Sequence, residues 1–325
     1  MPVLTFAPRS DVDQILDAAT QVKKPVALLW TGGCYDREIT PKYAIAKGLP
    51  VYRDALSCLR AVRAAMNYGE FLDARERRAA RQRPADIDVA VARTILADLS
   101  GTLSERTSKT VLAAYGFPVP PEMLARNVDE AVKAAVEIGG PVALKIESVD
   151  IPHKTDAGAI RLNVQGADAV RGGFAAVMGA AAAYAPAAKV DGVLVQKMAA
   201  PGGTEMILGF ADDPIFGPVV MAGLGGIHVE VLRDVAFRVP PIDIDEARSM
   251  LRELRAFRVL EGVRGQGPRD INALCDLIVR LSWLACDLRD RVEELDINPI
   301  LVYDVGKPAS VVDALVSLRD RSDAS

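Results

Sequence analysis

A lysine within an apolar segment, followed by a polar loop, is the feature of this sequence that points most directly to chemistry. Lys145 lies in residues 141–146, which are typical of a buried strand, and the next loop holds His153 and Gly158. An ammonium group supplies a point charge, and backbone N–H groups of a small-residue loop can close over oxygen atoms. This combination would suit a polyphosphate. The alternative is that Lys145 faces solvent at an edge or face of a sheet.

His153 is one of only two histidines among the 325 residues of the chain. A neutral imidazole is nucleophilic near neutral pH, so this side chain could accept a phosphoryl group or contact an oxyanion. The sequence alone also allows a surface histidine with neither role.

Side-chain oxygens recur near the end of the chain, where Asp296 and Asn298 stand two residues apart in a predicted strand. The two-residue period of a strand places both on one face of the sheet. Asp313 lies on the next predicted strand, after a turn. Such a set suits Mg²⁺, which takes one or two protein oxygens together with phosphate oxygens and water. Polar residues on an exposed sheet face are the alternative.

A glycine-rich turn that includes Gly225 and Gly226 follows another predicted strand. It matches neither the dinucleotide-binding fingerprint, because His228 stands where the third glycine is required, nor the Walker A loop, because no Gly-Lys-Ser/Thr follows. The glycines permit either a bound phosphate or simply a tight turn. Glu230 after the turn could face a cation, and Glu205, which follows an earlier loop, could meet a ribose or a metal-bound group. Either could equally be a solvated acid.

The elements that position these residues begin with an alternation of helix and strand patterns in residues 1–72, which favours a parallel sheet. Helices are predicted at residues 11–22, 41–47 and 54–68, and strands at 24–30 and 49–52. The alternation is too short for a complete doubly wound domain, so we expect a small or incomplete α/β unit. The dense charges that follow, in residues 73–94, predict a solvated helix or a linker.

Residues 95–325 mix helix and strand patterns without an internal repeat, which indicates an α+β domain. Helices are predicted at residues 103–115, 128–138, 168–184, 244–257 and 270–290. Strands are predicted at residues 141–146, 190–198, 205–209, 218–221, 294–303 and 310–313.

The overall composition, with 50% apolar and 25% charged residues, is that of an ordinary soluble globular protein. The net charge of −4 argues against a nucleic-acid partner. No apolar run is long enough to span a membrane, and no secretory signal is visible. The four cysteines form neither a C-x-x-C pair nor a metal-binding spacing, so we expect a cytoplasmic protein with reduced thiols.

Taken in order along the chain, these features resemble the ATP-grasp fold. More closely, residues 95–320 are similar to the nucleotide-binding part of the NDP-forming acyl-CoA synthetases, the family of ADP-forming acetyl-CoA synthetase and succinyl-CoA synthetase. The segments that carry the resemblance lie at residues 103–109, 151–158, 216–226, 262–265 and 295–299. The resemblance implies an ATP-grasp domain over residues 95–325, with lobes at about 118–195 and 196–320. A partial flavodoxin-like α/β segment at residues 1–72 would precede it.

The resemblance also implies a nucleotide site for ATP or ADP. Lys145 would hold the α- and β-phosphates, the loop around Gly158 would cover them, and Glu205 would contact the nucleotide. The backbone expected to meet the adenine base is that of Gln196, Lys197 and Met198.

For Mg²⁺ and the phosphoryl carrier, the resemblance implies a second set of roles. Asn298 and Asp313 would be the metal ligands, with Asp296 nearby. His153 matches a histidine thought to act as a second phosphate carrier in ADP-forming acetyl-CoA synthetases. The loop against which a carrier histidine docks would be formed by Gly225, Gly226 and Glu230.

The implied reaction is acid + CoA + ATP ⇌ acyl-CoA + ADP + Pi, with His153, Lys145 and Glu230 as the catalytic residues of this chain. The family's CoA-binding domain and the domain with the primary phosphohistidine have no counterpart in the sequence. We therefore expect a β-type subunit or fragment in an oligomer, whose α-type partner binds CoA and the carboxylic acid substrate.

Two other functions remain compatible with the sequence. One is a different ATP-grasp ligase, joining a carboxylate to an amine or thiol through an acyl-phosphate without a phosphohistidine. The other is a non-catalytic remnant that binds nucleotide only.

Overall fold

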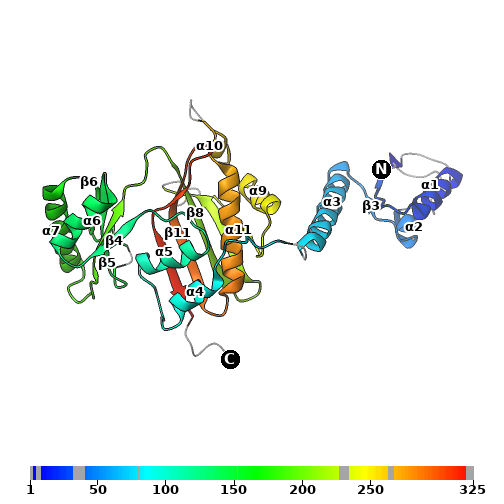
Figure 1. The fold of residues 1–325 in the computed structure, drawn as a ribbon. Coiled ribbons are helices and arrows are strands. Elements are labelled where there is room, and N and C mark those ends of the chain that lie inside the picture. Colours follow the sequence, from blue (N-terminus) through cyan, green and yellow to red (C-terminus); the bar gives the residue numbers. More distant parts are fainter. Residues whose placement is uncertain are drawn as a thin grey trace. The chain divides into compact units, whose positions relative to one another are not determined.

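A computed structural model describes residues 3–4, 9–31, 41–78, 81–151, 153–226, 234–262 and 267–319 of the chain. The chain divides into two compact units, an N-terminal unit of residues 1–80 and a C-terminal unit of residues 81–325 (Figure 1). Among the described residues, no helix is both long and apolar enough to cross a membrane.

The N-terminal unit contains a parallel sheet in the strand order β1-β2-β3, as the helix–strand alternation predicts. The strands are β1 (Val3–Leu4), β2 (Leu28–Trp30) and β3 (Val51–Tyr52). The helices are α1 (Arg9–Gln21), α2 (Pro41–Ala46) and α3 (Ala55–Arg78). Leu16, Leu28 and Trp30 form the centre of a small apolar core.

The described parts of the charged segment at residues 73–94, namely 73–78 and 81–94, each contain helix. The first residues of this segment extend α3 to Arg78, beyond the predicted end at residue 68, because Arg, Glu and Ala are good helix formers. Within the C-terminal unit, Arg81 forms ion pairs with Asp243 and Glu246. Helix α4 (Val89–Leu96) begins within the same segment, where Asp88 caps it by accepting a hydrogen bond from the backbone N–H of Val91.

The C-terminal unit has two lobes, and the first, the small lobe, is built on an antiparallel sheet in the order β4-β7-β5-β6. Its strands are β4 (Glu122–Ala125), β5 (Val142–Glu147), β6 (Ile160–Val164) and β7 (Gly192–Lys197). Helices α6 (Val128–Ile138) and α7 (Ala167–Tyr184) pack against each other and on this sheet (Figure 1). Their shared apolar core includes Val142, Leu144 and Ile146 of β5.

The large lobe is built on a second antiparallel sheet in the order β10-β9-β8-β11-β12, with β13 also paired to β11. Its strands are β8 (Thr204–Asp213), β9 (Gly217–Leu224), β10 (Val235–Arg238), β11 (Val292–Val302), β12 (Ser310–Val311) and β13 (Ala314–Leu318). Its helices include α9 (Ile244–Arg252), α10 (Arg258–Glu261) and α11 (Ile271–Asp287).

Helices α4 and α5 (Glu105–Ala114) precede the small lobe in sequence but pack in the core of the large lobe. Leu96, Val111 and Leu112 are buried there among side chains of the large-lobe sheet. The chain therefore leaves the large lobe after α5, forms the whole small lobe, and returns at β8. This path brings the start of α5 next to the small-lobe sheet.

Candidate functional site

Lys145 lies on the face of β5 that is turned away from the small-lobe core. Val142, Leu144 and Ile146 fill that core, and the two-residue period of a strand places Lys145 on the opposite face. The Lys145 side chain is buried, and its ammonium nitrogen lies 2.8 Å from the backbone carbonyl oxygen of Val312 in the large lobe. Lys145 is therefore not the solvent-exposed strand lysine that the sequence left possible.

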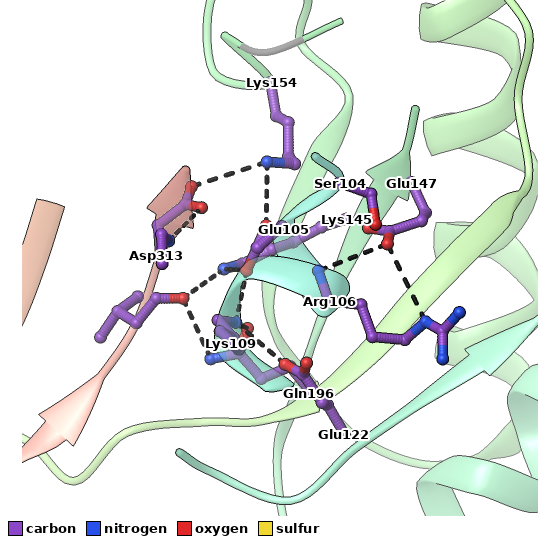
Figure 2. A network of polar contacts seen from close by, with 12 residues as sticks. Ser104, Glu105, Arg106, Lys109, Glu122, Lys145, Glu147, Lys154, Gln196 and Asp313 are labelled. Carbon is purple, nitrogen blue, oxygen red and sulfur yellow. Dashed lines mark hydrogen bonds and ion pairs between the residues drawn. The ribbon is translucent and has the colours of Figure 1, made fainter. Parts of the chain in front are cut away.

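Glu105 is the counter-ion of this lysine and of two more. It follows Ser104, which caps α5 by accepting a hydrogen bond from the backbone N–H of Thr107. Its carboxylate oxygens lie 2.7 Å from the nitrogen of Lys145, 2.5 Å from that of Lys109 and 2.9 Å from that of Lys154 (Figure 2).

The charges of this cluster shift its pKa values in definite directions. Burial alone would raise the pKa of Glu105, but the charges of Lys145, Lys109 and Lys154 outweigh burial and hold that pKa below its usual range. Burial lowers the pKa of Lys145, and the charge of Glu105 opposes this fall. Burial also acts to lower the pKa of Lys154, but the charges of Glu105 and Asp313 raise it overall.

Lys109 connects the cluster to the hinge, the name used here for Gln196, Lys197 and Met198, whose backbone is expected to meet the adenine base. Its ammonium nitrogen lies 2.9 Å from Glu122 and 3.0 Å from the side-chain oxygen of Gln196 (Figure 2). The backbone N–H of Lys197 donates to Pro121, and that of Met198 donates to Pro141. These two N–H groups are therefore already used within the protein, so an adenine base would have to meet other backbone groups of this hinge.

The loop with His153 and Gly158 forms a tight turn after β5. The N–H groups of Ala157, Gly158 and Ala159 donate to the carbonyl oxygens of His153, Thr155 and Lys154. Gly158 has a φ of 60°, a left-handed conformation that favours glycine. His153 is exposed. Because the later N–H groups are used internally, those near Lys154 at the start of the turn are the ones that could meet a phosphate.

The predicted metal ligands lie together on β11 and just before β13. The backbone N–H of Asn298 donates to the carbonyl oxygen of Asp313 at 3.2 Å, and the Asp313 carboxylate lies 3.7 Å from the nitrogen of Lys154. Burial raises the pKa of Asp296 to about 6, helped by the charges of Glu294 and Asp313. Burial and the charge of Glu105 raise the pKa of Asp313.

This donor set fits Mg²⁺. Its oxygens come from two carboxylates and an amide. A cation would offset the burial and the neighbouring negative charges that raise the pKa of Asp296. In the described part of the chain, no group of three or more His, Cys, Asp or Glu residues could hold a metal ion by itself. The phosphates of a nucleotide would therefore have to supply the remaining ligands.

Glu205 and the glycine-rich turn form a neighbouring part of the large lobe. Glu205 lies on β8 opposite Leu301 of β11, and the N–H of Gly225 donates to its carbonyl oxygen at 2.8 Å. A Cβ at Gly226 would lie 2.8 Å from the Glu205 carboxylate, so the turn packs directly on this acid. Glu230 falls outside the described residues.

Sequence reasoning missed four members of the buried polar cluster: Glu105, Lys109, Glu122 and Lys154. One signal was present, since Glu105 and Lys109 stand four residues apart in a helix that begins after Ser104. Nothing in that spacing shows that both residues face the strand of another lobe.

The sequence of residues 94–318 matches the family model of an ATP-grasp domain. The chain is 44% identical over 225 residues to the β subunit of ADP-forming acetate–CoA ligase II of Pyrococcus furiosus, which covers 69% of this chain and 95% of that subunit. It is 38% identical over 312 residues to ADP-forming acetate–CoA ligase I of Archaeoglobus fulgidus, which covers 94% of this chain but only 44% of that protein.

A solved structure is also similar, namely the dinucleotide forming acetyl-coenzyme A synthetase 1 of Ca. Korarchaeum cryptofilum in complex with coenzyme A and Mg-AMPPCP. The identity is 37% and the TM-score 0.61, over 70% of this chain and all of the compared chain (100%). In that structure, a phosphohistidine segment points towards the nucleotide binding site.

Proposed function

We propose that this chain, which belongs to the ATP-grasp family and within it to the ADP-forming acyl-CoA synthetases, transfers a phosphoryl group between ATP or ADP and a phosphohistidine. The overall reaction is acid + CoA + ATP ⇌ acyl-CoA + ADP + Pi. One contact carries the proposal. The ammonium group of Lys145, in the small lobe, donates a hydrogen bond to the backbone carbonyl of Val312, the residue before Asp313 in the large lobe. The ammonium group that would bind phosphate and the oxygens that would bind Mg²⁺ therefore come together from two lobes.

The lysines would bind and neutralise the phosphates. Lys145 and Lys154 bring two ammonium groups to one carboxylate, and phosphoryl transfer is catalysed mainly by positioning and charge neutralisation. Asn298 and Asp313, with Asp296 nearby, would hold Mg²⁺, which neutralises charge on the phosphate oxygens when bound.

His153 would act as a carrier of the phosphoryl group. In the transfer, the lone pair of a neutral imidazole nitrogen forms the N–P bond while the bond between the γ-phosphorus and the bridging oxygen of ADP breaks. The exposure of His153, at the start of the turn that contains Lys154, supports this role. The phosphohistidine segment of the similar solved structure gives independent support for histidine chemistry at such a site.

CoA and the carboxylic acid would bind to a partner. The chain spans nearly all of a relative that is named a β subunit, but less than half of a relative named as a single ligase. The remaining length of the latter supports a CoA-binding chain or domain with the primary phosphohistidine. We propose that this chain is active only together with that partner, in an oligomer.

The test is transfer of ³²P in the reconstituted complex. The chain, purified with the CoA-binding protein it captures from its own cells, is incubated with [γ-³²P]ATP and Mg²⁺, and acid-labile label on histidine is measured. We expect Lys145→Ala to lower the rate of transfer by about 10²–10³-fold. The control is Lys133→Ala, an exposed lysine on α6. Transfer without any phosphohistidine, or equal rates for both variants, would overturn the proposal.

A further inference from the structure

Glu105 and Lys109 belong to residues 103–109, a segment that carries the family resemblance but has no part in the proposed function so far. Both lie on α5, whose apolar residues Val111 and Leu112 are buried in the large-lobe core. The two charged side chains pair with each other and with residues of the small lobe, and they are only 3% and 0% exposed. Burying charges is costly, so their place needs a physical reason.

The two carboxylate oxygens of Glu105 meet different lysines of the small lobe. Oε1 lies 2.7 Å from the ammonium nitrogen of Lys145, on β5, and Oε2 lies 2.9 Å from that of Lys154, in the following turn (Figure 2). Lys109, on the same helix as Glu105, lies 2.5 Å from Oε1 and so restrains the carboxylate. A single buried carboxylate therefore fixes the separation of the two ammonium groups.

We propose that Glu105 is a positioning residue of the nucleotide site, whose carboxylate holds the ammonium groups of Lys145 and Lys154 where they receive the phosphates of ADP or ATP. The inference rests on the proposed function, because it gives these two lysines the phosphates as their ligand. Glu105 acts through the lysines and needs no contact with the nucleotide itself.

Glu122 is a second buried partner of Lys109 and so serves as a control for Glu105. It lies 2.9 Å from Lys109 and is largely buried, as Glu105 is. In the part of the chain that the structure describes, its ion pair is with Lys109, whereas Glu105 also pairs with Lys145 and Lys154. Loss of the charge at either position removes a buried partner of Lys109, but only loss at Glu105 releases the two phosphate-binding lysines.

The experiment measures the affinity of the full chain for Mg-ADP and for adenosine by isothermal titration calorimetry, in Glu105→Gln and in Glu122→Gln. We expect Glu105→Gln to weaken Mg-ADP binding by about 10- to 100-fold and to change adenosine binding by less than about 3-fold. Glu122→Gln should change both affinities by less than about 3-fold. A purely structural role for Glu105 would weaken both ligands together, and thermal unfolding shows how much stability each variant loses.

The outcomes separate this inference from the proposed function. If the wild-type chain bound no Mg-ADP, the nucleotide site would be wrong and the inference would fall with it. If the wild-type chain bound Mg-ADP and Glu105→Gln bound it equally well, only the inference would be overturned. Should Glu105→Gln fail to fold, Glu105→Asp decides, because it keeps the charge on a shorter stem. A selective loss of Mg-ADP affinity in Glu105→Asp supports the proposal, and an unchanged affinity overturns it.

Discussion

The ammonium nitrogen of Lys145, in the small lobe, lies 2.8 Å from the backbone carbonyl oxygen of Val312, in the large lobe. Val312 directly precedes Asp313, and the carbonyl oxygen of Asp313 accepts a hydrogen bond from the N–H of Asn298. Segments that are more than 150 residues apart therefore meet at one point. A nucleotide site assembled from Lys145, Asn298 and Asp313 requires this meeting.

The proposed metal-binding role of Asp313 predicts a change in the Mg²⁺ dependence of ADP binding. Asp313→Asn removes a negative charge from the oxygen cluster, so the Mg²⁺ concentration needed for half-maximal ADP binding should rise by about tenfold or more. Titration of ADP binding against Mg²⁺ measures this. Glu293→Gln, an exposed acid on β11, is the matched control and should leave the Mg²⁺ dependence unchanged. Equal Mg²⁺ dependence in both variants would contradict the assignment.

The raised pKa of Asp296 predicts that, without metal, Asp296→Asn and wild type differ in free energy of unfolding by an amount that depends on pH. Burial, then the charges of Glu294 and Asp313, raise its pKa from 3.8 to about 6, which corresponds to at most about 3 kcal/mol. Because Asp296 is only half-buried, we expect about 1–2 kcal/mol.

The sign follows from the two pKa values of Asp296. A raised pKa in the folded state favours folding at low pH, and this contribution is lost as the pH rises from about 4 to 6. Asparagine cannot ionise, so Asp296→Asn should become more stable relative to wild type over that range and keep a constant advantage above it. Denaturant unfolding in EDTA at pH 4, 6 and 8 measures this difference. An advantage that is equal at all three values would contradict the raised pKa.

Local periodicity predicts most of the longer helices and strands, including the lysine strand. It does not predict the short elements β1, β4, β6, β10, β13, α4 and α10. The alternation in β5 puts Val142, Leu144 and Ile146 on one face and Lys145 on the other, and the sequence contains all of that information. It could not predict that Glu105 is the partner of Lys145. That contact depends on α5 packing in the large lobe while the small lobe is inserted after it, which is a property of the tertiary fold.

The sequence predicts the position of the hinge along the chain, but it does not predict which hydrogen bonds the hinge backbone makes. Gln196, Lys197 and Met198 stand at the expected end of β7, but the N–H groups of Lys197 and Met198 donate to Pro121 and Pro141. Both acceptors belong to connections between elements, which follow no sequence period. Which backbone groups remain for a ligand therefore depends on loop conformation.

The packing of Gly226 on Glu205 predicts that alanine at position 226 weakens Mg-ADP binding, whereas alanine at position 202 does not. In Gly226→Ala the new Cβ would lie 2.8 Å from the Glu205 carboxylate, and φ is 68°. Gly202→Ala is the control, because φ there is 85° but a Cβ meets nothing within 4 Å. Both variants should lose about 1 kcal/mol in free energy of unfolding from the backbone strain. Only Gly226→Ala should weaken Mg-ADP binding, by several-fold, because it displaces Glu205. Equal affinities in calorimetry would argue against a nucleotide contact by Glu205.

The proposed carrier role of His153 predicts that its substitution stops phosphoryl transfer but leaves nucleotide binding intact. His153→Gln keeps a polar side chain of similar size but has no nucleophilic nitrogen, so transfer of ³²P from ATP to the partner should fall by about 10²-fold or more. Mg-ADP affinity should stay within about 3-fold of wild type, because Lys145, Lys154 and the proposed metal ligands are unchanged. The chain has one other histidine, His228, so His228→Gln is the matched control for any acid-labile label on this chain. Label that persists in His153→Gln and disappears in His228→Gln would transfer the carrier role to His228. Normal transfer in His153→Gln would remove His153 from the phosphoryl path.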